Sequence, residues 1–233
     1  MIRRATVEWP SAAPFRDRGG RPIRFLAVSD EREPALEIAR NRELLVPLDG
    51  VIGCGDLDPR WLAFLGDAFA APLIYVRGNH DRGGDWDERR LVVPDPLRSG
   101  SEVHLAGLRI AAFEWPDIES QGNRRRSDIA WTQALRLMIP RLMAGVLRGS
   151  EPLLVVSHAP PEGVGDGDDA YHRGFPGYRL LLDRLQPPLW LHGHTTVASV
   201  DQLVVECGRS TVINVTGAVL VEIRPPAADP AHR

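Results

Sequence analysis

The feature that most constrains this fold is a series of short apolar runs, each of which stops abruptly at polar residues. Apolar runs at 23–29, 51–54 and 73–76 alternate with helical spacing at 33–45 and 61–69. Strand, helix and strand in this order is the pattern of a βαβ unit, which builds a parallel sheet. Ligands of such sheets gather at the carboxyl ends of the strands. The pattern therefore predicts an α/β protein whose site lies at that edge.

The second half of the chain continues the pattern of strands and adds two helices. A hairpin is expected over 103–115, with its turn at Ala106 and Gly107. A long helix is expected over 128–147, and Pro140 should kink or split it because proline lacks the amide proton of a helical bond. Further strands are expected at 152–157, 189–191, 200–205, 211–215 and 219–223, with a helix at 175–185.

Size and composition suit one globular domain. Hydrophobic residues make up 43% and charged residues 25%, which excludes a disordered or fibrous chain. With 28 basic and 31 acidic residues, the net charge of −3 gives no electrostatic reason to expect general nucleic-acid or membrane-surface binding. The 233 residues show no repeat and no linker. We assign residues 1–22 to an N-terminal extension, 23–224 to the domain and 225–233 to a flexible tail.

The chain contains no lysine, so all 28 basic residues are arginine. This excludes sites that depend on a lysine, such as a P-loop, a Schiff base or a Ser-Lys pair. Its two cysteines, Cys54 and Cys207, lie in apolar stretches and cannot form a disulfide framework. The first residues do not resemble a signal peptide, and no apolar run approaches the length of a membrane span. We expect a cytoplasmic protein that does not associate with membranes.

Five of the predicted strands end in residue types that bind metal ions. They end at Ser29-Asp30-Glu31-Arg32, Gly55-Asp56-Leu57-Asp58, Gly78-Asn79-His80-Asp81, Ser157-His158-Ala159-Pro160 and His192-Gly193-His194. By composition, the motif Gly-Asn-His-Asp should arise by chance in roughly one such sequence per thousand. Carboxylate, amide and imidazole ligands suit Mn²⁺, Fe²⁺, Zn²⁺ or Ni²⁺, and the lack of cysteine ligands disfavours a structural zinc site.

These motifs, in this order and over roughly residues 23–223, resemble the calcineurin-like metallophosphoesterases. The resemblance implies a two-sheet β-sandwich flanked by helices, with four layers in the order αββα. It also implies metal-dependent hydrolysis of a phosphoester, monoester or diester, by a metal-activated water at a site of one or two divalent ions. The implied ligands are Asp56, Asn79, His158 and His192 for one ion, with Asp56 bridging to a second held by Asp30 and His194. His80 would act on the phosphoryl group or the leaving oxygen without binding metal.

The sequence departs from the family pattern at two positions. The first motif, Asp-x-His in the family, ends here in Arg32, which is always protonated and cannot bind a metal. Either Glu31, His172 or a carboxylate from 166–169 completes the first site, or Arg32 replaces the ion and holds phosphate through its guanidinium. Many members also carry an aspartate that orients the catalytic histidine, at the position of Pro59 in this chain.

Several of these residues have simpler explanations. His172 could equally be an exposed loop histidine or a substrate-binding residue. Residues 163–169 could be a plain surface loop or the rim of the active site. The three arginines at 124–126 are typical of a solvated surface; the alternative is that they attract an anionic substrate. Loss of the first-motif histidine also leaves a second function open, a catalytically weakened protein-binding scaffold. The expected partner of an enzyme is a small-molecule or macromolecular phosphoester.

Overall fold

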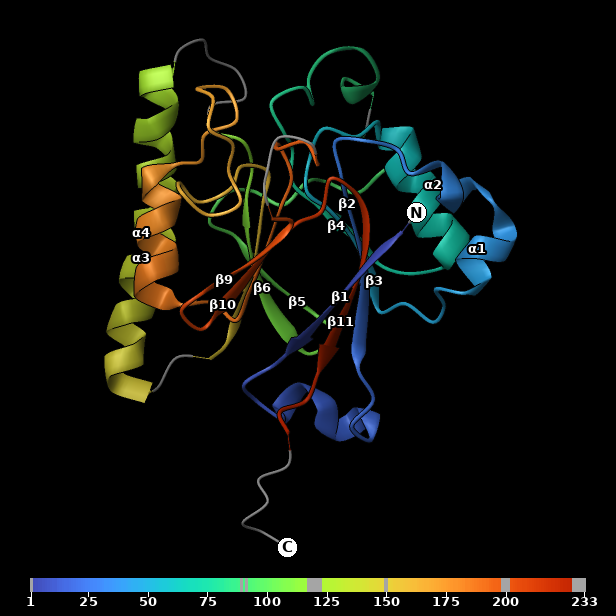
Figure 1. The fold of residues 1–233 in the computed structure, drawn as a ribbon, viewed down its shortest axis with the longest axis horizontal. Coiled ribbons are helices and arrows are strands. Elements are labelled where there is room, and N and C mark those ends of the chain that lie inside the picture. The colour runs from blue at the N-terminus through green and yellow to red at the C-terminus, as the bar shows by residue number, and fades with distance from the viewer. Residues whose placement is uncertain are drawn as a thin grey trace, which may run out of the picture.

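Two β-sheets packed face to face form the centre of the molecule in this computed structural model, which describes residues 2–88, 90, 92–116, 123–148, 151–197 and 202–227 (Figure 1). The first sheet has the order β1 (Arg3–Glu8), β11 (Gly217–Arg224), β2 (Ile23–Ser29), β3 (Gly50–Gly53), β4 (Leu73–Tyr75). The second has the order β5 (Glu102–Leu105), β6 (Leu108–Phe113), β7 (Leu153–Ser157), β8 (Leu189–His192), β10 (Ser210–Asn214), β9 (Val204–Cys207).

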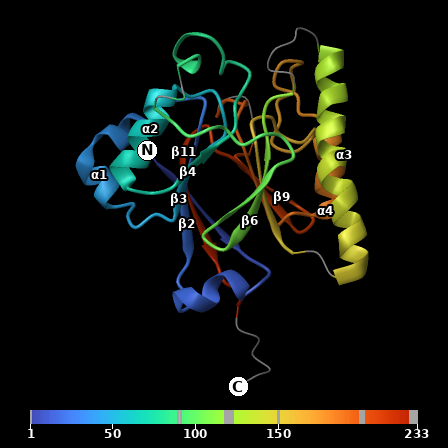
Figure 2. The ribbon, with the colours of Figure 1, turned by 180° about the vertical axis from the view of Figure 1, so that it is seen from behind.

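Helices cover the outer face of each sheet, as the front and back views show (Figures 1 and 2). On the first sheet lie α1 (Ala39–Glu43) and α2 (Pro59–Phe69), and on the second α3 (Asn123–Arg148) and α4 (Pro176–Leu185). Three short 3-10 helices complete the elements: η1 (Ala13–Arg18), η2 (Pro34–Glu37) and η3 (Gly84–Trp86). The expected four-layer sandwich is therefore confirmed. None of the helices within the described ranges is long and apolar enough to cross a membrane.

Side chains along a strand point alternately to the two faces of its sheet, and in this fold both faces are buried. In β2, Phe25 and Ala27 point into the core between the sheets, whereas Leu26 and Val28 pack beneath the helices of the first layer. Because both faces are covered, the strand needs apolar residues at nearly every position and reads as a continuous run. The pairs β2–β3, β3–β4, β6–β7 and β7–β8 are parallel, so their carboxyl ends lie along one edge of the sandwich.

Some elements differ from the predictions. The helix expected over 33–45 is two short pieces, η2 and α1, because side chains compete for its backbone carbonyls: Asn41 Nδ2 donates to Ala35 O, and Arg42 Nη1 donates to Leu36 O and Glu37 O. Of the kink or split expected at Pro140, the split is wrong, since α3 continues through this residue. Pro140 lies on the exposed face of α3, where water reaches the carbonyl that loses its helical partner.

Strand β1 was not predicted, and it lies inside the segment assigned to an N-terminal extension. It pairs in parallel with β11, from Arg3 beside Val219 to Glu8 beside Arg224. The remaining strands lie close to their predicted positions, including the hairpin whose turn is at Ala106 and Gly107. The domain boundaries stay a prediction. Residues 228–233 of the predicted tail, 200–201 of the strand expected at 200–205, and the side chains of 124–125 lie outside the described residues.

Candidate metal centre

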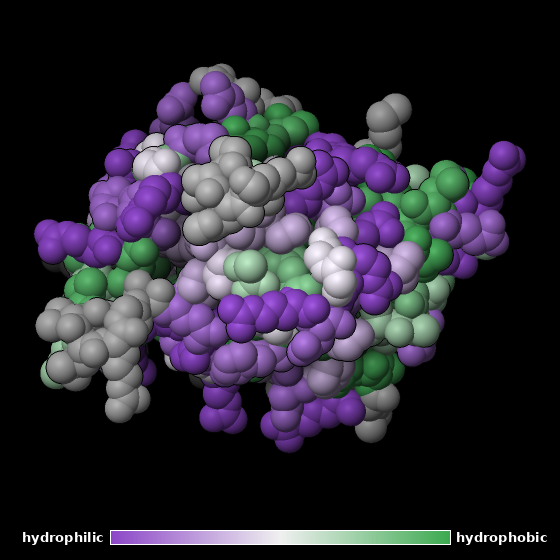
Figure 3. All heavy atoms as spheres, turned by 90° about the horizontal axis from the view of Figure 1, so that it is seen from below, coloured by the Kyte–Doolittle hydropathy of each residue, from purple (hydrophilic) through white to green (hydrophobic). Residues whose placement is uncertain are grey.

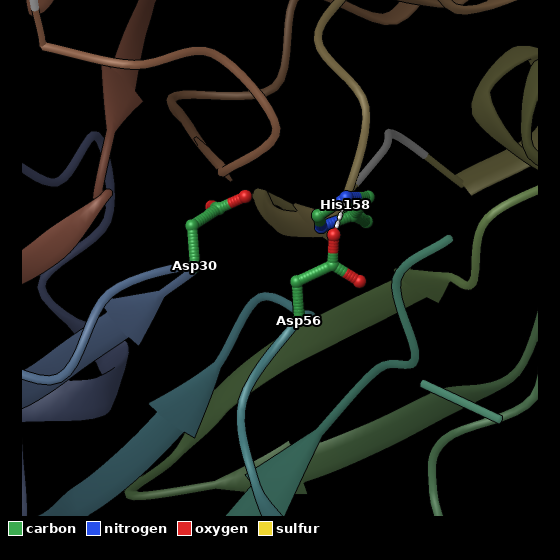
Figure 4. Close-up of side chains that lie close together, drawn as sticks. All are labelled: Asp30, Asp56 and His158. Carbon is green, nitrogen blue, oxygen red and sulfur yellow. Dashed lines mark ion pairs between the residues drawn. The ribbon is translucent and has the colours of Figure 1, made fainter. Parts of the chain in front are cut away.

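Three of the predicted ligands meet at the edge where parallel strands of the two sheets end. Asp30 follows β2, Asp56 follows β3 and His158 follows β7. Each offers one ligand atom, and these atoms all lie within 4.8 Å of one another. Figure 4 shows the two carboxylates and the imidazole facing the same space, with Asp56 Oδ2 3.3 Å from His158 Nε2. The group therefore takes residues from both sheets.

Backbone strain marks two residues of this group and one further predicted ligand. Six described non-glycine residues have positive φ, of which Ala70 and Gln186 end helices and Ala106 lies in the hairpin turn. The other three are Asp30, Asp56 and His194, with φ of 59°, 57° and 67°. Such conformations cost about 1 kcal/mol or more each and persist only where the surrounding structure holds them, which is typical of functional sites.

Glycine is required between the two histidines of His-Gly-His. A Cβ on Gly193 would overlap the side chains of Ser29 and Asp30, so only glycine lets the loop after β8 lie against the end of β2. The contact is used: the His194 amide donates to Asp30 Oδ2 at 3.0 Å. Thr216 Oγ1 donates to the same oxygen at 3.2 Å. Asp30 is therefore held by both sheets before any ion binds.

Asp81 fixes the loop that carries the other carboxylate. It is buried, and its Oδ2 accepts from the amides of Asp56 at 2.8 Å and Gly78 at 2.7 Å. Burial raises the pKa of Asp81 to about 7. The sequence motif includes this residue, but sequence reasoning assigned it no role. The structure shows that it joins the loops after β3 and β4.

His158 and Asn79 present the donor set of a cation site. His158 Nδ1 donates to Cys54 O at 2.8 Å, which leaves Nε2 facing Asn79 Oδ1 at 2.9 Å and Asp56 Oδ2. An unprotonated Nε2 would be an acceptor facing two acceptors, so this point requires a proton or a metal ion. Imidazole nitrogen, amide oxygen and carboxylate oxygen suit a borderline divalent ion. The residues present therefore fit a metal.

The charges of the group show the same preference for a cation. Burial opposes protonation of His158, but attraction to Asp56 and Asp30 outweighs it and raises the pKa of His158 to about 9. Burial raises the pKa of Asp30. It acts in the same direction on Asp56, but attraction to His158 and hydrogen bonds outweigh it, so the pKa of Asp56 lies below its usual value. Without metal, a proton on His158 supplies the positive charge that the two carboxylates attract.

The two histidines at the end of β8, His192 and His194, are neutral and buried. Burial lowers the pKa of His192 to about 4 and, together with repulsion from His158, lowers that of His194 to about 3. Neutral imidazole is the form that binds metal. Within the described part of the chain, His192 Nε2 is buried without a hydrogen-bond partner, while its Nδ1 lies 2.9 Å from Gly193 O. An orphaned buried nitrogen of this kind fits a ligand atom.

The structure does not bring every predicted site residue to the group. The Arg32 guanidinium pairs with Asp58 at 2.7 Å and lies over the Trp61 ring, and its side chain is 52% exposed. His172 Nδ1 lies 2.6 Å from Asp169 Oδ2, and its ring centroid is 5.6 Å from that of His194. The contacts of Arg32 and His172 therefore support neither a replacement ligand for the first site nor phosphate binding by Arg32. Among the described residues, the metal group lacks Glu31, His172 and the acids of 166–169, and it also lacks the predicted ligands His192 and His194.

His80 lies at the rim. Its amide donates to Asp56 Oδ1 at 2.8 Å, and its exposed ring contacts the hydroxyl of Tyr171 at 2.9 Å. Sequence reasoning missed Tyr171, whose hydroxyl also accepts from Asn79 Nδ2 at 2.9 Å and whose carbonyl lies 2.8 Å from His194 Nε2. No local pattern could have shown it, because Tyr171 is about ninety residues away from His80 in the sequence.

Arg32→His is expected to strengthen metal binding by about tenfold, because it adds a neutral imidazole beside Asp30, and changes in the ligand environment of a metal alter its affinity by at least this factor. Titration calorimetry with Mn²⁺ measures the change. Arg32→Ala is the control: it also breaks the pair with Asp58 but adds no ligand, so its affinity should match the parent. Equal affinity in all three proteins would show that this position faces away from the ion.

A cavity of about 730 Å³ lies at the opposite end of the sandwich, where β7 and β8 begin. Its lining includes Pro152, Pro188, Arg184 and Arg209. Figure 3 shows the molecule from below, the end opposite the candidate metal group, with mostly hydrophilic residues around paler, more apolar ones. Because the predicted ligands follow the other ends of these strands, this cavity is separate from the metal group.

Comparison with known proteins gives a family and a fold. The family described as calcineurin-like phosphoesterase matches residues 44–198. No curated protein matches the chain. The structure of TT1561 from Thermus thermophilus is similar at 17% identity and a TM-score of 0.52, covering 84% of this chain and 90% of that one. A candidate 5'-nucleotidase from Staphylococcus aureus, in complex with alpha-ketoglutarate, is similar at 12% identity and a TM-score of 0.54, covering 84% of this chain and 49% of that one. At these identities the likeness shows the fold alone.

Proposed function

The chain belongs to the calcineurin-like phosphoesterase family, and we propose that it hydrolyses a phosphodiester with Mn²⁺ or a similar divalent ion. The family implies metal-dependent phosphoester hydrolysis in general. The observation that carries the proposal for this chain is the meeting of Asp30, Asp56 and His158, whose ligand atoms lie within 4.8 Å. Fe²⁺, Zn²⁺ and Ni²⁺ suit the same donors. The substrate is proposed to be a small-molecule or macromolecular phosphoester.

The proposed ligands are Asp56, Asn79, His158 and His192 for one ion, with Asp30 and His194 for a second. A bound ion would supply an activated water and positive charge next to the phosphoryl group. Asp81 and Gly193 support this set from behind by holding the loops of Asp56 and Asp30. His80 is proposed as the catalytic residue that donates a proton to the leaving oxygen, since its ring is exposed at the rim.

Charge favours a diester as the first substrate to test. One divalent ion neutralises the carboxylates of Asp30 and Asp56, and a second ion leaves two positive charges. Arg32 adds little to this balance because Asp58 neutralises it. A singly charged diester therefore needs less positive charge at the site than a doubly charged monoester does. A cytoplasmic location is also proposed, supported by the two cysteines, which are both free.

The purified protein is expected to hydrolyse bis-p-nitrophenyl phosphate when Mn²⁺ is added. Release of p-nitrophenol measures the rate, and elemental analysis gives the ions per chain. A chelator should abolish hydrolysis, because the proposed nucleophile is a water activated by the metal ion. Fresh Mn²⁺ should restore the activity. Should the protein bind metal yet hydrolyse neither monoesters nor diesters with any of the four ions, the scaffold function would replace this proposal.

A further inference from the structure

We infer that Tyr171 is a positioning residue that holds the His80 ring in the orientation needed to protonate the leaving group, and that it favours the Nδ1–H tautomer when the ring is neutral. The inference rests on the proposed function for its catalytic part. Among the described residues, the Tyr171 hydroxyl is the one hydrogen-bond partner found for the His80 ring, at 2.9 Å from Nε2. Without it, an exposed imidazole would be free to change rotamer, and proton transfer requires a fixed geometry.

The hydrogen bonds around Tyr171 favour one position for the proton of the neutral His80 ring. The side-chain oxygen of Asn79, Oδ1, faces His158 Nε2 at 2.9 Å. Its side-chain nitrogen, Nδ2, therefore faces Tyr171 and donates to the Tyr171 hydroxyl. The hydroxyl has a single proton, and we place it in the bond to His80 Nε2. His80 Nε2 is then an acceptor, and Nδ1 carries the ring proton. In the doubly protonated ring that acts as the acid, Nε2–H donates to the Tyr171 oxygen instead, and Nδ1–H is free to donate to a leaving oxygen. The transfer returns the ring to neutral imidazole.

Three further contacts hold Tyr171 in place. Asp169 Oδ1 accepts from the Tyr171 amide at 2.8 Å, and the Tyr171 carbonyl accepts from His194 Nε2 at 2.8 Å. The ring lies 5.3 Å, centroid to centroid, from that of His194. Yet Tyr171 is 52% exposed, so its ring does not serve to fill the core. Its hydroxyl is thus a fixed point that joins the proposed metal group to His80.

The first test needs neither metal nor substrate. In metal-free protein labelled with ¹⁵N-histidine, long-range ¹H–¹⁵N correlations report which ring nitrogen of His80 carries the proton. We expect the Nδ1–H tautomer in the parent and a shift towards Nε2–H in Tyr171→Phe, which lacks the hydroxyl. Tyr75→Phe is the matched control, because it also loses one hydroxyl bond, to Pro94 O at 2.7 Å. The same His80 tautomer in parent and Tyr171→Phe would overturn the inference.

The second test varies the leaving group of an aryl phosphodiester. p-Nitrophenol leaves with little protonation, whereas phenol requires a proton, so Tyr171→Phe should lower kcat by about tenfold or more for the phenyl ester and much less for the p-nitrophenyl ester. KM should stay unchanged, and in the His80→Ala background Tyr171→Phe should have no further effect. An equal loss for both esters, or a loss without His80, would contradict the inference. If the protein hydrolyses no ester, the proposed function fails and the tautomer measurement decides the inference alone.

Discussion

Asp56→Asn is expected to weaken metal binding by at least about a hundredfold and to reduce hydrolysis to background, since even residues that only support a ligand change affinity by this factor. The substitution removes the negative charge that faces His158 Nε2 at 3.3 Å. It also removes the attraction that raises the pKa of His158 to about 9, so the group loses its preference for a positive charge. Calorimetry with Mn²⁺ measures the affinity, and the same samples give kcat.

Asp58→Asn is the matched control for this variant. It makes the same chemical change two residues later, at the residue that caps α2 and pairs with Arg32. Asparagine is also a good helix cap, so folding should be kept. Its metal affinity should equal that of the parent. If Asp56→Asn also bound Mn²⁺ as tightly as the parent, the proposed metal group would be wrong.

His80→Ala is expected to lower kcat for a phenyl phosphodiester by about 10²–10⁴-fold, the usual contribution of general acid-base catalysis. Metal affinity should not change, because the bond from the residue 80 amide to Asp56 Oδ1 does not need the side chain. The kinetics and the calorimetric titration are run on the same preparation. The loss should be smaller for a p-nitrophenyl ester, whose leaving group requires little protonation.

His104→Ala controls for the loss of an imidazole as such. His104 is exposed on β5 and is paired in the hairpin with Arg109, in the part of the second sheet farthest in order from β8. Its kcat and KM should match those of the parent. An unchanged kcat in His80→Ala would remove His80 from the catalytic role and would leave Tyr171 without a residue to position.

The sequence was most informative where strands are buried on both faces. The strand β2 reads as a continuous apolar run because neither of its faces meets water, and the polar residue that ends it is therefore conspicuous. This is why Asp30, Asp56 and His158 could be named before their geometry was known. In contrast, β1 at the sheet edge alternates exposed and more buried residues and lacks such a run. Its position depends on pairing with a strand more than two hundred residues later.

The parts of the site that the sequence did not predict are long-range contacts of side chains. Nothing in the local pattern shows that Arg32 reaches Asp58 instead of the phosphate, since acidic residues follow several of the neighbouring strands. Tyr171 lies in a segment without regular structure, where no periodicity shows the direction of a side chain. Its role depends on where its loop rests in the folded chain. Such contacts follow from packing and not from composition or spacing.

The origin of the metal group in two sheets couples ion binding to folding. The carboxylates of Asp30 and Asp56 follow strands of one sheet, and the imidazole of His158 follows a strand of the other. Elsewhere the apolar core between the sheets holds them together. An ion held by all three residues would act as a cross-link between the halves, and a ligand at a hundred times its dissociation constant stabilises the folded state by about 2.7 kcal/mol. Metal supply would then affect the stability of the folded protein, beyond its effect on catalysis.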